Sequence, residues 1–331
     1  MRVLITGITG PVGSALAEYL LTLPDVEVHG FKRWRSDTRS IQNVMGRVVL
    51  HEGDVEDPYS VERAVERAAP DRVYHLAAQS YPSESWDAPM TTFRVNVEGT
   101  INVLEAVRRH CPDAAIHVAG TSAQYGWVEP HETPILESHT MRPASPYGVS
   151  KVAAELTALQ YHDSYGLHTV VTRSFNHVGP YQGDRCSIQT FCQQMVSIEN
   201  GLREPVIRVG NLETRRDFSH TEDVARALWL LLEHGDPGEV YNLCSGEATR
   251  IGDILEFVRQ QGTVPCDVVV DSARLRPSDE PLLMGDNTKL KAATGWEPVI
   301  TIEAIVSEIM SYWRERLRDD RRMSSRDAAT V

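Results

Sequence analysis

The sequence has little of what marks membrane proteins or nucleic-acid-binding proteins. Its 331 residues contain no apolar run that approaches the roughly 18 residues of a membrane helix. Lysine and arginine number 33 against 46 aspartates and glutamates, so the formal charge is −13 and the chain as a whole repels phosphate backbones. We therefore predict no membrane span and no nucleic-acid partner. Any anionic ligand must be held by a local pocket of positive charge.

Cysteine is also scarce. The chain has five cysteines, an odd number, and no pair has C-x-x-C spacing, which argues against a disulfide framework and against a zinc site. The N-terminal run MRVLITGITG lacks the longer apolar segment and the cleavage site of a secretory signal. These features predict reduced thiols, no metal and a cytoplasmic location.

What the first half does contain is an alternation of short apolar runs with helical patterns. The predicted strands are Val3–Thr6, Val26–Phe31, Val48–Leu50, Arg72–Leu76, Ala115–Val118 and His168–Thr172. The predicted helices are Val12–Leu23, Val61–Ala69, Thr100–Arg109 and Lys151–Tyr165. Such alternation favours parallel pairing with right-handed crossovers, and hence an α/β fold with a doubly wound, Rossmann-like parallel sheet.

After Thr172 this rhythm breaks, which predicts a smaller C-terminal α/β cap that binds the substrate. This part has a predicted helix near Ile188–Asn200 and later short units around Asp223–Leu232, Ile251–Gln260 and Ile302–Leu317, with a solvated helix end from about Arg314. We predict a dinucleotide-binding domain over residues 1–175, to which segments near 220–245 return. Residues 176–331 would form mainly the substrate domain.

Three glycines follow the first predicted strand and precede a helix. Gly7, Gly10 and Gly13, with Val12 between the last two, would form the tight turn of a dinucleotide site. Such a turn needs backbone without Cβ, so that a pyrophosphate can approach peptide N–H groups and the positive end of the helix. The position in the first strand–helix unit favours this interpretation over a simple turn.

The residues after the second strand favour NADP over NAD. An acidic residue there would hold the ribose 2′-hydroxyl of NAD, but the chain has Lys32, Arg33 and Arg35. Arg33 is the best candidate, because a guanidinium can bind a 2′-phosphate through two parallel hydrogen bonds. An interpretation as surface cations alone stays open at this point.

Two further loops are predicted to line the cofactor. Asp54 and Val55 follow the third strand, where the Asp54 carboxylate can accept a hydrogen bond from the adenine amino group. Leu76, Ala77 and Ala78 end the fourth strand with small residues beside the dinucleotide.

Tyr147 and Lys151 stand four residues apart, so on a helix both side chains face one side, one turn apart. A nearby ammonium is predicted to lower the tyrosine pKa, which would let the phenol transfer a proton near neutral pH while the lysine anchors a ribose. Thr121 follows the fifth strand at the sheet edge where doubly wound folds keep their sites. Taken alone the pair is also explained as surface decoration; with Thr121 it predicts chemistry on a carbonyl or carbinol.

Together these motifs resemble the extended short-chain dehydrogenase/reductase family of nucleotide-sugar enzymes, over nearly the whole chain. The strings that narrow the resemblance to GDP-4-keto-6-deoxy-D-mannose reductases are Arg142–Gly148, Arg173–Pro180, Val209–Leu212, Arg215–Phe218 and Leu275–Asp279. The segment His29–Arg33 is similar instead to the sibling GDP-mannose 4,6-dehydratases, which use NADP.

The resemblance also implies binding residues and an assembly. The residues implied to hold the GDP-linked substrate are Asn176, Arg185, Val209, Asn211, Arg216 and Arg276. Among them the arginines would contact the diphosphate, although surface pairing of Arg216 with Asp217 or Glu222 stays open. The family commonly pairs subunits through helices corresponding to residues 91–109 and 151–165, which implies a homodimer.

The reaction is predicted from the two residues directly after the catalytic threonine. A 4,6-dehydratase needs an additional carboxylate for the elimination, and family dehydratases carry it at this point, where this chain has Ser122 and Ala123. Glu84 or Glu129 could substitute from a loop.

We therefore predict the NADPH-dependent reduction of the C4 ketone of GDP-4-keto-6-deoxy-D-mannose to GDP-D-rhamnose. The alternatives are a 4,6-dehydratase or a 4-epimerase acting on GDP-mannose or a related nucleotide sugar, and a noncatalytic NADP-sensing protein.

Overall fold

The alternating apolar runs fold into one large parallel sheet. The computed structural model describes residues 1–183, 186–275 and 280–328. The large sheet has the strand order β10-β6-β5-β4-β1-β2-β3. Its strands are β1 (Arg2–Thr6), β2 (Glu27–Lys32), β3 (Val48–Glu52), β4 (Arg72–His75), β5 (Ala115–Ala119), β6 (His168–Ser174) and β10 (Val240–Leu243). All six pairings are parallel, which confirms the predicted doubly wound sheet.

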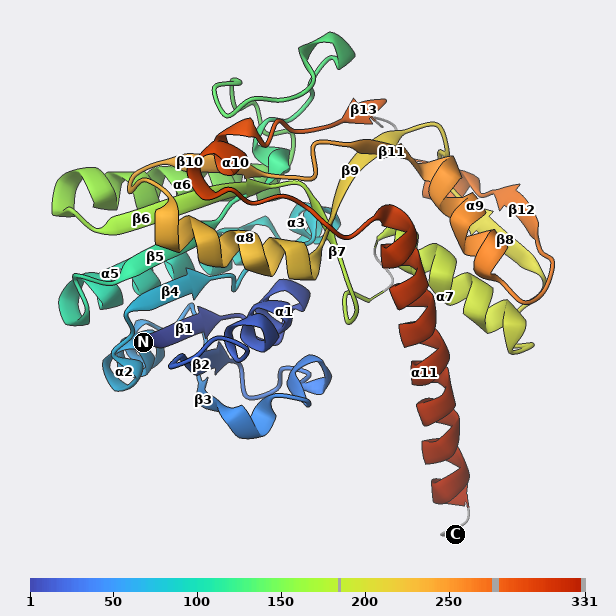
Figure 1. Cartoon of the computed structure of the whole chain (residues 1–331), viewed down its shortest axis with the longest axis horizontal. Coiled ribbons are helices and arrows are strands. Elements are labelled where there is room, and N and C mark those ends of the chain that lie inside the picture. The colour runs from blue at the N-terminus through green and yellow to red at the C-terminus, as the bar shows by residue number, and fades with distance from the viewer. Residues whose placement is uncertain (184–185, 276–279, 329–331) are drawn as a thin grey trace.

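Helices cover both faces of this sheet (Figure 1). One face carries α1 (Pro11–Leu20) and α8 (Thr221–His234), and the other carries α2 (Pro58–Ala68), α5 (Gly99–His110) and α6 (Pro146–Tyr165). The strands are apolar on both sides for this reason.

Neighbouring residues of β1 show this arrangement. Ile5 packs in the first core with Leu16 of α1, whereas Leu4 packs in the second core with Val65 of α2. A charge at either position would therefore be buried, whichever face it pointed to.

The last strand of the large sheet comes from far along the chain. β10 pairs with β6, and the helix before it, α8, packs against α1. Residues 221–243 thus lie on the large sheet although the chain leaves that sheet after β6.

Two small sheets and a third core form the other part of the molecule (Figure 1). One sheet has the order β11-β9-β13, with β7 also paired to β9, and the other consists of β12 and β8. These strands are β7 (Asn176–Val178), β8 (Val206–Val209), β9 (Arg215–His220), β11 (Ala248–Arg250), β12 (Asp267–Val270) and β13 (Leu282–Leu283). The third core lies among helices α7 (Ser187–Glu199), α9 (Ile251–Gln261) and α11 (Ile302–Ala328).

The C-terminal helix differs from its prediction. α11 runs to Ala328, well past the expected end at Leu317. Arg314, which was expected on a solvated end, instead forms an ion pair with Glu199 of α7 at 2.7 Å and donates to the Gln261 carbonyl. Only Arg314 departs from the predicted solvated end, because its partner lies on a helix far away in the sequence, whereas residues 318–321 are exposed as expected.

Two simpler features complete the fold. None of the five cysteines forms a disulfide. Among the described residues, no helix has both the length and the apolar character needed to cross a bilayer.

Candidate active site

The glycine turn after β1 is packed too tightly for side chains. Gly7 has a φ of +72°, and a Cβ built on it would lie 2.8 Å from the backbone nitrogen of Ala77. A Cβ on Gly13 would lie 2.4 Å from the Gly7 carbonyl oxygen. Gly10 is the N-cap residue of α1, and the first turn of that helix has no acidic residue, so its positive end is not offset. This bare, positively polarised turn fits the pyrophosphate of a dinucleotide.

The end of β4 is tied to the same turn. Thr6 accepts a hydrogen bond from the Ala77 N–H at 3.2 Å, and its hydroxyl also bonds His75 Nδ1 at 2.8 Å. The structure thus brings Leu76 and Ala77 beside Gly7, with Ala78 next in the chain, as a common dinucleotide site requires.

The three cations after β2 are not equivalent. Lys32 is buried, and its ammonium pairs with Glu52 at 2.8 Å. Arg33 and Arg35 are exposed, and within the described residues neither side chain has an ion-pair partner. Of the three, therefore, the two arginines are placed to meet a phosphate.

The loop after β3 exposes part of the Asp54 carboxylate and buries Val55. An Asp54 carboxylate oxygen accepts from the Glu56 N–H at 3.2 Å, which leaves the other oxygen for a ligand. The Val55 side chain packs into the second core, and its carbonyl accepts from Asn102 at 2.8 Å. Val12 is half-buried against the first core.

Helix α6 carries the predicted catalytic pair on its buried face. The helix begins at Pro146, and the Ser145 hydroxyl caps it by accepting from the Gly148 N–H at 3.1 Å. Tyr147 and Lys151 are 8% and 6% exposed. The Lys151 ammonium donates to the carbonyl of Ala119, the last residue of β5, at 2.8 Å.

Thr121 completes this constellation. It is the N-cap residue of a short 3-10 turn, Ser122–Gln124, directly beyond β5. Its side chain lies close enough to the Tyr147 phenol to lower the pKa of that group. The structure therefore brings Thr121, Tyr147 and Lys151 together at the carboxyl end of the sheet.

Burial has the largest effect on the pKa values of both Tyr147 and Lys151. It raises the pKa of Tyr147 to about 12, with only the Thr121 hydrogen bond acting in the opposite direction. It lowers the pKa of Lys151 to about 8. The prediction that Lys151 lowers the tyrosine pKa is thus wrong, because burial raises the pKa of the phenol and the Lys151 ammonium is turned to the Ala119 carbonyl.

Asn96 is a site residue that the sequence analysis missed. It lies in a π-helical stretch, Arg94–Glu98, between α4 (Pro89–Phe93) and α5. Its side chain accepts from the Gln79 N–H at 2.8 Å and donates to the Ser150 hydroxyl at 2.9 Å. It therefore joins the loop after β4 to α6, next to Lys151. The available signal was a polar residue within an apolar helical pattern, at a point where π-helical turns are often functional.

Of the predicted substrate residues, Asn176 and Arg216 lie on paired strands of the same small sheet. Asn176 on β7 faces β9 and donates to the Asp217 carbonyl at 2.9 Å. Arg216 on β9 donates to the Glu280 carbonyl at 2.7 Å. Both are half-buried, so each keeps surface for a ligand. Arg185 and Arg276 lie outside the described residues.

The predicted nucleoside contact is placed differently from the expectation. The Val209 side chain is fully buried in the third core, so it cannot reach a ligand. The residues after it remain available: Gly210 packs closely on Arg274, and Asn211 is exposed, with its side-chain oxygen Oδ1 accepting from the Glu213 N–H at 2.9 Å. Any contact at Val209 would be through the main chain.

The parallel sheet, the glycine turn and the threonine–tyrosine–lysine set define an extended short-chain dehydrogenase/reductase. More particularly, the chain belongs to the GDP-mannose 4,6 dehydratase family, whose sequence profile matches residues 4–309.

Relatives within this family carry two different names. The chain is 33% identical over 319 residues to a GDP-6-deoxy-D-mannose reductase of Pseudomonas aeruginosa. The match covers 96% of this chain and 99% of the relative. It is 32% identical over 348 residues to a GDP-mannose 4,6-dehydratase of Vibrio cholerae, covering 93% and 92%.

Solved structures extend the likeness. RMD from Pseudomonas aeruginosa, complexed with NADPH, superposes with a TM-score of 0.83 at 31% identity, covering 96% of this chain and all of that one. The UDP-glucose 4-epimerase of Thermotoga maritima with UDP-glucose gives a TM-score of 0.85 at 27% identity and the same coverage. The same scaffold therefore occurs in a chain named for reduction and in one named for epimerisation.

The buried ammonium of Lys151 gives a prediction for the protein without ligands. Between pH 8 and 10.5 the folded protein binds fewer protons at this group than the unfolded chain, so the group makes stability rise with pH in that window. The shift corresponds to about 3 kcal/mol. Lys151→Met should therefore be more stable than the wild type near pH 7, with an advantage that shrinks towards pH 10.5. Urea unfolding at several pH values measures this, and an advantage independent of pH would contradict it.

Proposed function

We propose that the protein reduces the C4 ketone of a GDP-linked 4-keto-6-deoxy-D-mannose with NADPH, giving GDP-D-rhamnose. The observation that carries the proposal is the end of β5, where Thr121 meets Tyr147 but the next two residues are Ser122 and Ala123. Neither can act as the acid or base that removes water from the sugar. Ketone reduction needs only a proton donor, a hydrogen bond to the forming alkoxide and a hydride source.

The residues of the site fit these roles. When bound, NADPH supplies the hydride. Tyr147, which burial keeps protonated, gives its proton to the C4 oxygen. Thr121 donates a hydrogen bond to the same oxygen as negative charge develops there. The Lys151 ammonium would lie between the Tyr147 phenol and the ribose hydroxyls of the cofactor.

The cofactor would lie along the carboxyl edge of the sheet. Gly7, Gly10 and Gly13 would face its pyrophosphate, and Leu76–Ala78 would run beside it. Arg33 and Arg35 would bind the 2′-phosphate. The relative named RMD was solved with NADPH, which supports the choice of NADP.

The sugar nucleotide would lie against the smaller part of the molecule. Asn176 and Arg216 would contact its diphosphate, together with Arg185 and Arg276, and Asn211 would lie beside the nucleoside. We propose on this basis that residues up to about 175, with 220–245, serve the cofactor and that most of residues 176–331 serve the substrate. A homodimer through α5 and α6 and a cytoplasmic location are part of the same proposal.

A 4,6-dehydratase is the competing function, because several relatives carry that name. It would require a carboxylate from elsewhere. Glu129 is exposed and accepts from the Trp127 indole at 3.0 Å, which ties it to its own loop. Glu84, on the short helix α3 (Pro82–Asp87) packed against α6, is the better substitute.

Supplying both substrates to one preparation separates the two functions. With NADPH, GDP-4-keto-6-deoxy-D-mannose should be consumed with loss of absorbance at 340 nm, whereas GDP-mannose should stay unchanged. Tyr147→Phe should lower turnover by about 100-fold or more, because the proton donor is lost, and should keep NADPH binding. Dehydration of GDP-mannose by the wild type would overturn the proposal, and Glu84→Gln would then show which carboxylate acts.

Arg33→Ala should weaken NADPH binding about 10-fold or more while leaving NADH binding nearly unchanged, because only NADPH carries the 2′-phosphate. Arg39→Ala is the matched control, since Arg39 lies in the same loop but is paired with Asp37. Fluorescence titration of both dinucleotides measures the effect. Equal weakening of NADPH and NADH would remove Arg33 from 2′-phosphate recognition.

A further inference from the structure

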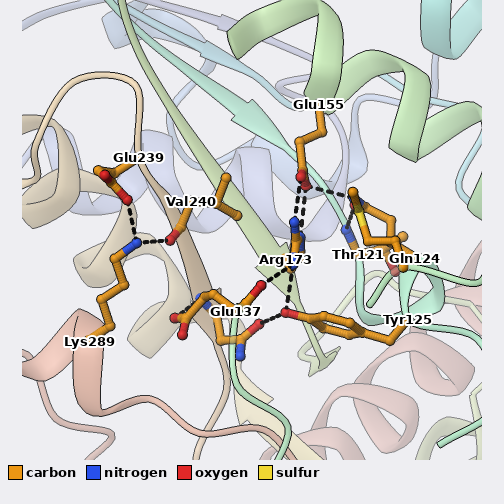
Figure 2. A network of polar contacts seen from close by, with 11 residues as sticks. Thr121, Gln124, Tyr125, Glu137, Glu155, Arg173, Glu239, Val240 and Lys289 are labelled. Atoms are coloured by element: carbon orange, nitrogen blue, oxygen red, sulfur yellow. Dashed lines mark hydrogen bonds and ion pairs between the residues drawn. The ribbon is translucent and has the colours of Figure 1, made fainter. Parts of the chain in front are cut away.

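A buried amide connects the catalytic threonine to the interior of the protein (Figure 2). Gln124 has no exposed surface. Its side-chain oxygen accepts from the Thr121 N–H at 2.8 Å, and its side-chain nitrogen donates to a Glu155 carboxylate oxygen at 2.6 Å. The oxygen of this amide is thus bonded to the loop after β5, and its nitrogen is bonded to α6.

The far end of this link is fixed by a buried ion pair (Figure 2). Glu155 is 1% exposed and receives two hydrogen bonds from the Arg173 guanidinium of β6, at 2.6 and 2.9 Å. Arg173 also donates to the Tyr125 hydroxyl at 3.1 Å and to the Glu137 carbonyl at 2.8 Å. The Glu155 carboxylate therefore has little freedom to move.

The space around Gln124 is equally restricted. A Cβ on Gly120 would lie 2.5 Å from the Gln124 side-chain oxygen and 2.5 Å from the Thr172 carbonyl oxygen. Gln124 is the fourth residue, at position N3, of the capping box whose first residue is Thr121. The position of the Thr121 backbone is thus set by an amide that is itself held at both ends.

This matters because the Thr121 side chain lies close enough to Tyr147 to lower the pKa of its phenol, and because Lys151 and Glu155 lie on the same helix as Tyr147. We propose that Gln124 is a positioning residue, whose amide aligns the Thr121 hydroxyl with Tyr147 by joining the Thr121 backbone to the buried Glu155–Arg173 pair. This inference rests on the proposed function for its kinetic meaning. Nothing in the roles predicted from the sequence assigned any part to Gln124.

The proposal requires an amide at position 124. A methionine has a similar length but offers neither bond. A glutamate keeps the shape but meets the Glu155 carboxylate, so it replaces the amide only while it holds a proton. The other ionisable groups around this point include Arg173 on β6, Tyr125 on the loop and Lys151 one turn along α6. Glu137 and His139 lie beside Arg173 and Tyr125.

The first experiment compares Gln124→Met with Gln194→Met. Gln194, on α7, is also buried and uses its amide on both main-chain groups of Arg208, far from the catalytic loop. We expect Gln124→Met to lower kcat by about 10- to 100-fold with KM changed less than about threefold, since a small misplacement of a reacting group is costly. Gln194→Met should lower the melting temperature but keep kcat.

The second experiment uses the pH profile of Gln124→Glu. Its kcat relative to the wild type should be close to one at pH 5, where the introduced carboxyl group is protonated and donates to Glu155. The ratio should fall as the pH rises to 8, because the shared proton is lost and the two carboxylates repel. A purely structural role for residue 124 would give a ratio that does not change with pH.

A third measurement needs no substrate, so it separates failure of this inference from failure of the proposed function. In protein with methyl-labelled threonine, the Thr121 methyl resonance should shift in Gln124→Met and stay unchanged in Gln194→Met. An unmoved resonance, or a Gln124→Met enzyme with wild-type kcat, would overturn the inference. If wild-type protein does not reduce the keto sugar but the resonance shifts, the positioning stands and the assigned reaction fails.

Discussion

The site depends on the burial of one ammonium group and one phenol on the same face of α6. Tyr147 and Lys151 are nearly inaccessible, and the ammonium reaches the last carbonyl of β5. Burial is unfavourable for a charged lysine and favourable for a neutral tyrosine. The elements packed against α6 must therefore provide partners for the polar side chains on its buried face.

Two other polar side chains on or beside this face of α6 have such partners. Glu155, further along the same face, is paired with Arg173 of β6, and Asn96 bonds Ser150 from the π-helical stretch. Removing one partner of such a buried pair typically costs about 3 to 5 kcal/mol, because the other charge stays buried. Strand β6 and the loop after β4 are thereby tied to α6, and the glycine turn after β1 is tied to the end of β4. This is how the parallel sheet places the glycine turn and the Tyr147 phenol at one edge.

Much of this could be predicted from the sequence, because it depends on local spacing. The alternating apolar runs predict the parallel sheet, the glycines at 7, 10 and 13 predict the turn, and the four-residue step from Tyr147 to Lys151 predicts a shared helix face. The features that could not be predicted depend on contacts between distant segments. Three interactions of this kind join residues on different elements: Lys32 with Glu52, Gln124 with Glu155, and Arg314 with Glu199. The tyrosine pKa was predicted in the wrong direction for a related reason, since a sequence shows the neighbouring lysine but not the loss of water around the phenol.

The account's central claim is that the hydride reaches C4 of the sugar from an external cofactor while Tyr147 gives the proton. The most direct measurement follows deuterium by NMR, with NADPH deuterated on the transferred side and GDP-4-keto-6-deoxy-D-mannose as acceptor. The account predicts one deuterium at C4 of the product for each NADPH oxidised. Given GDP-mannose deuterated at C4 instead, appearance of that deuterium at C6 would reveal a dehydratase, and its return to C4 with inverted configuration would reveal an epimerase; either result would contradict the claim.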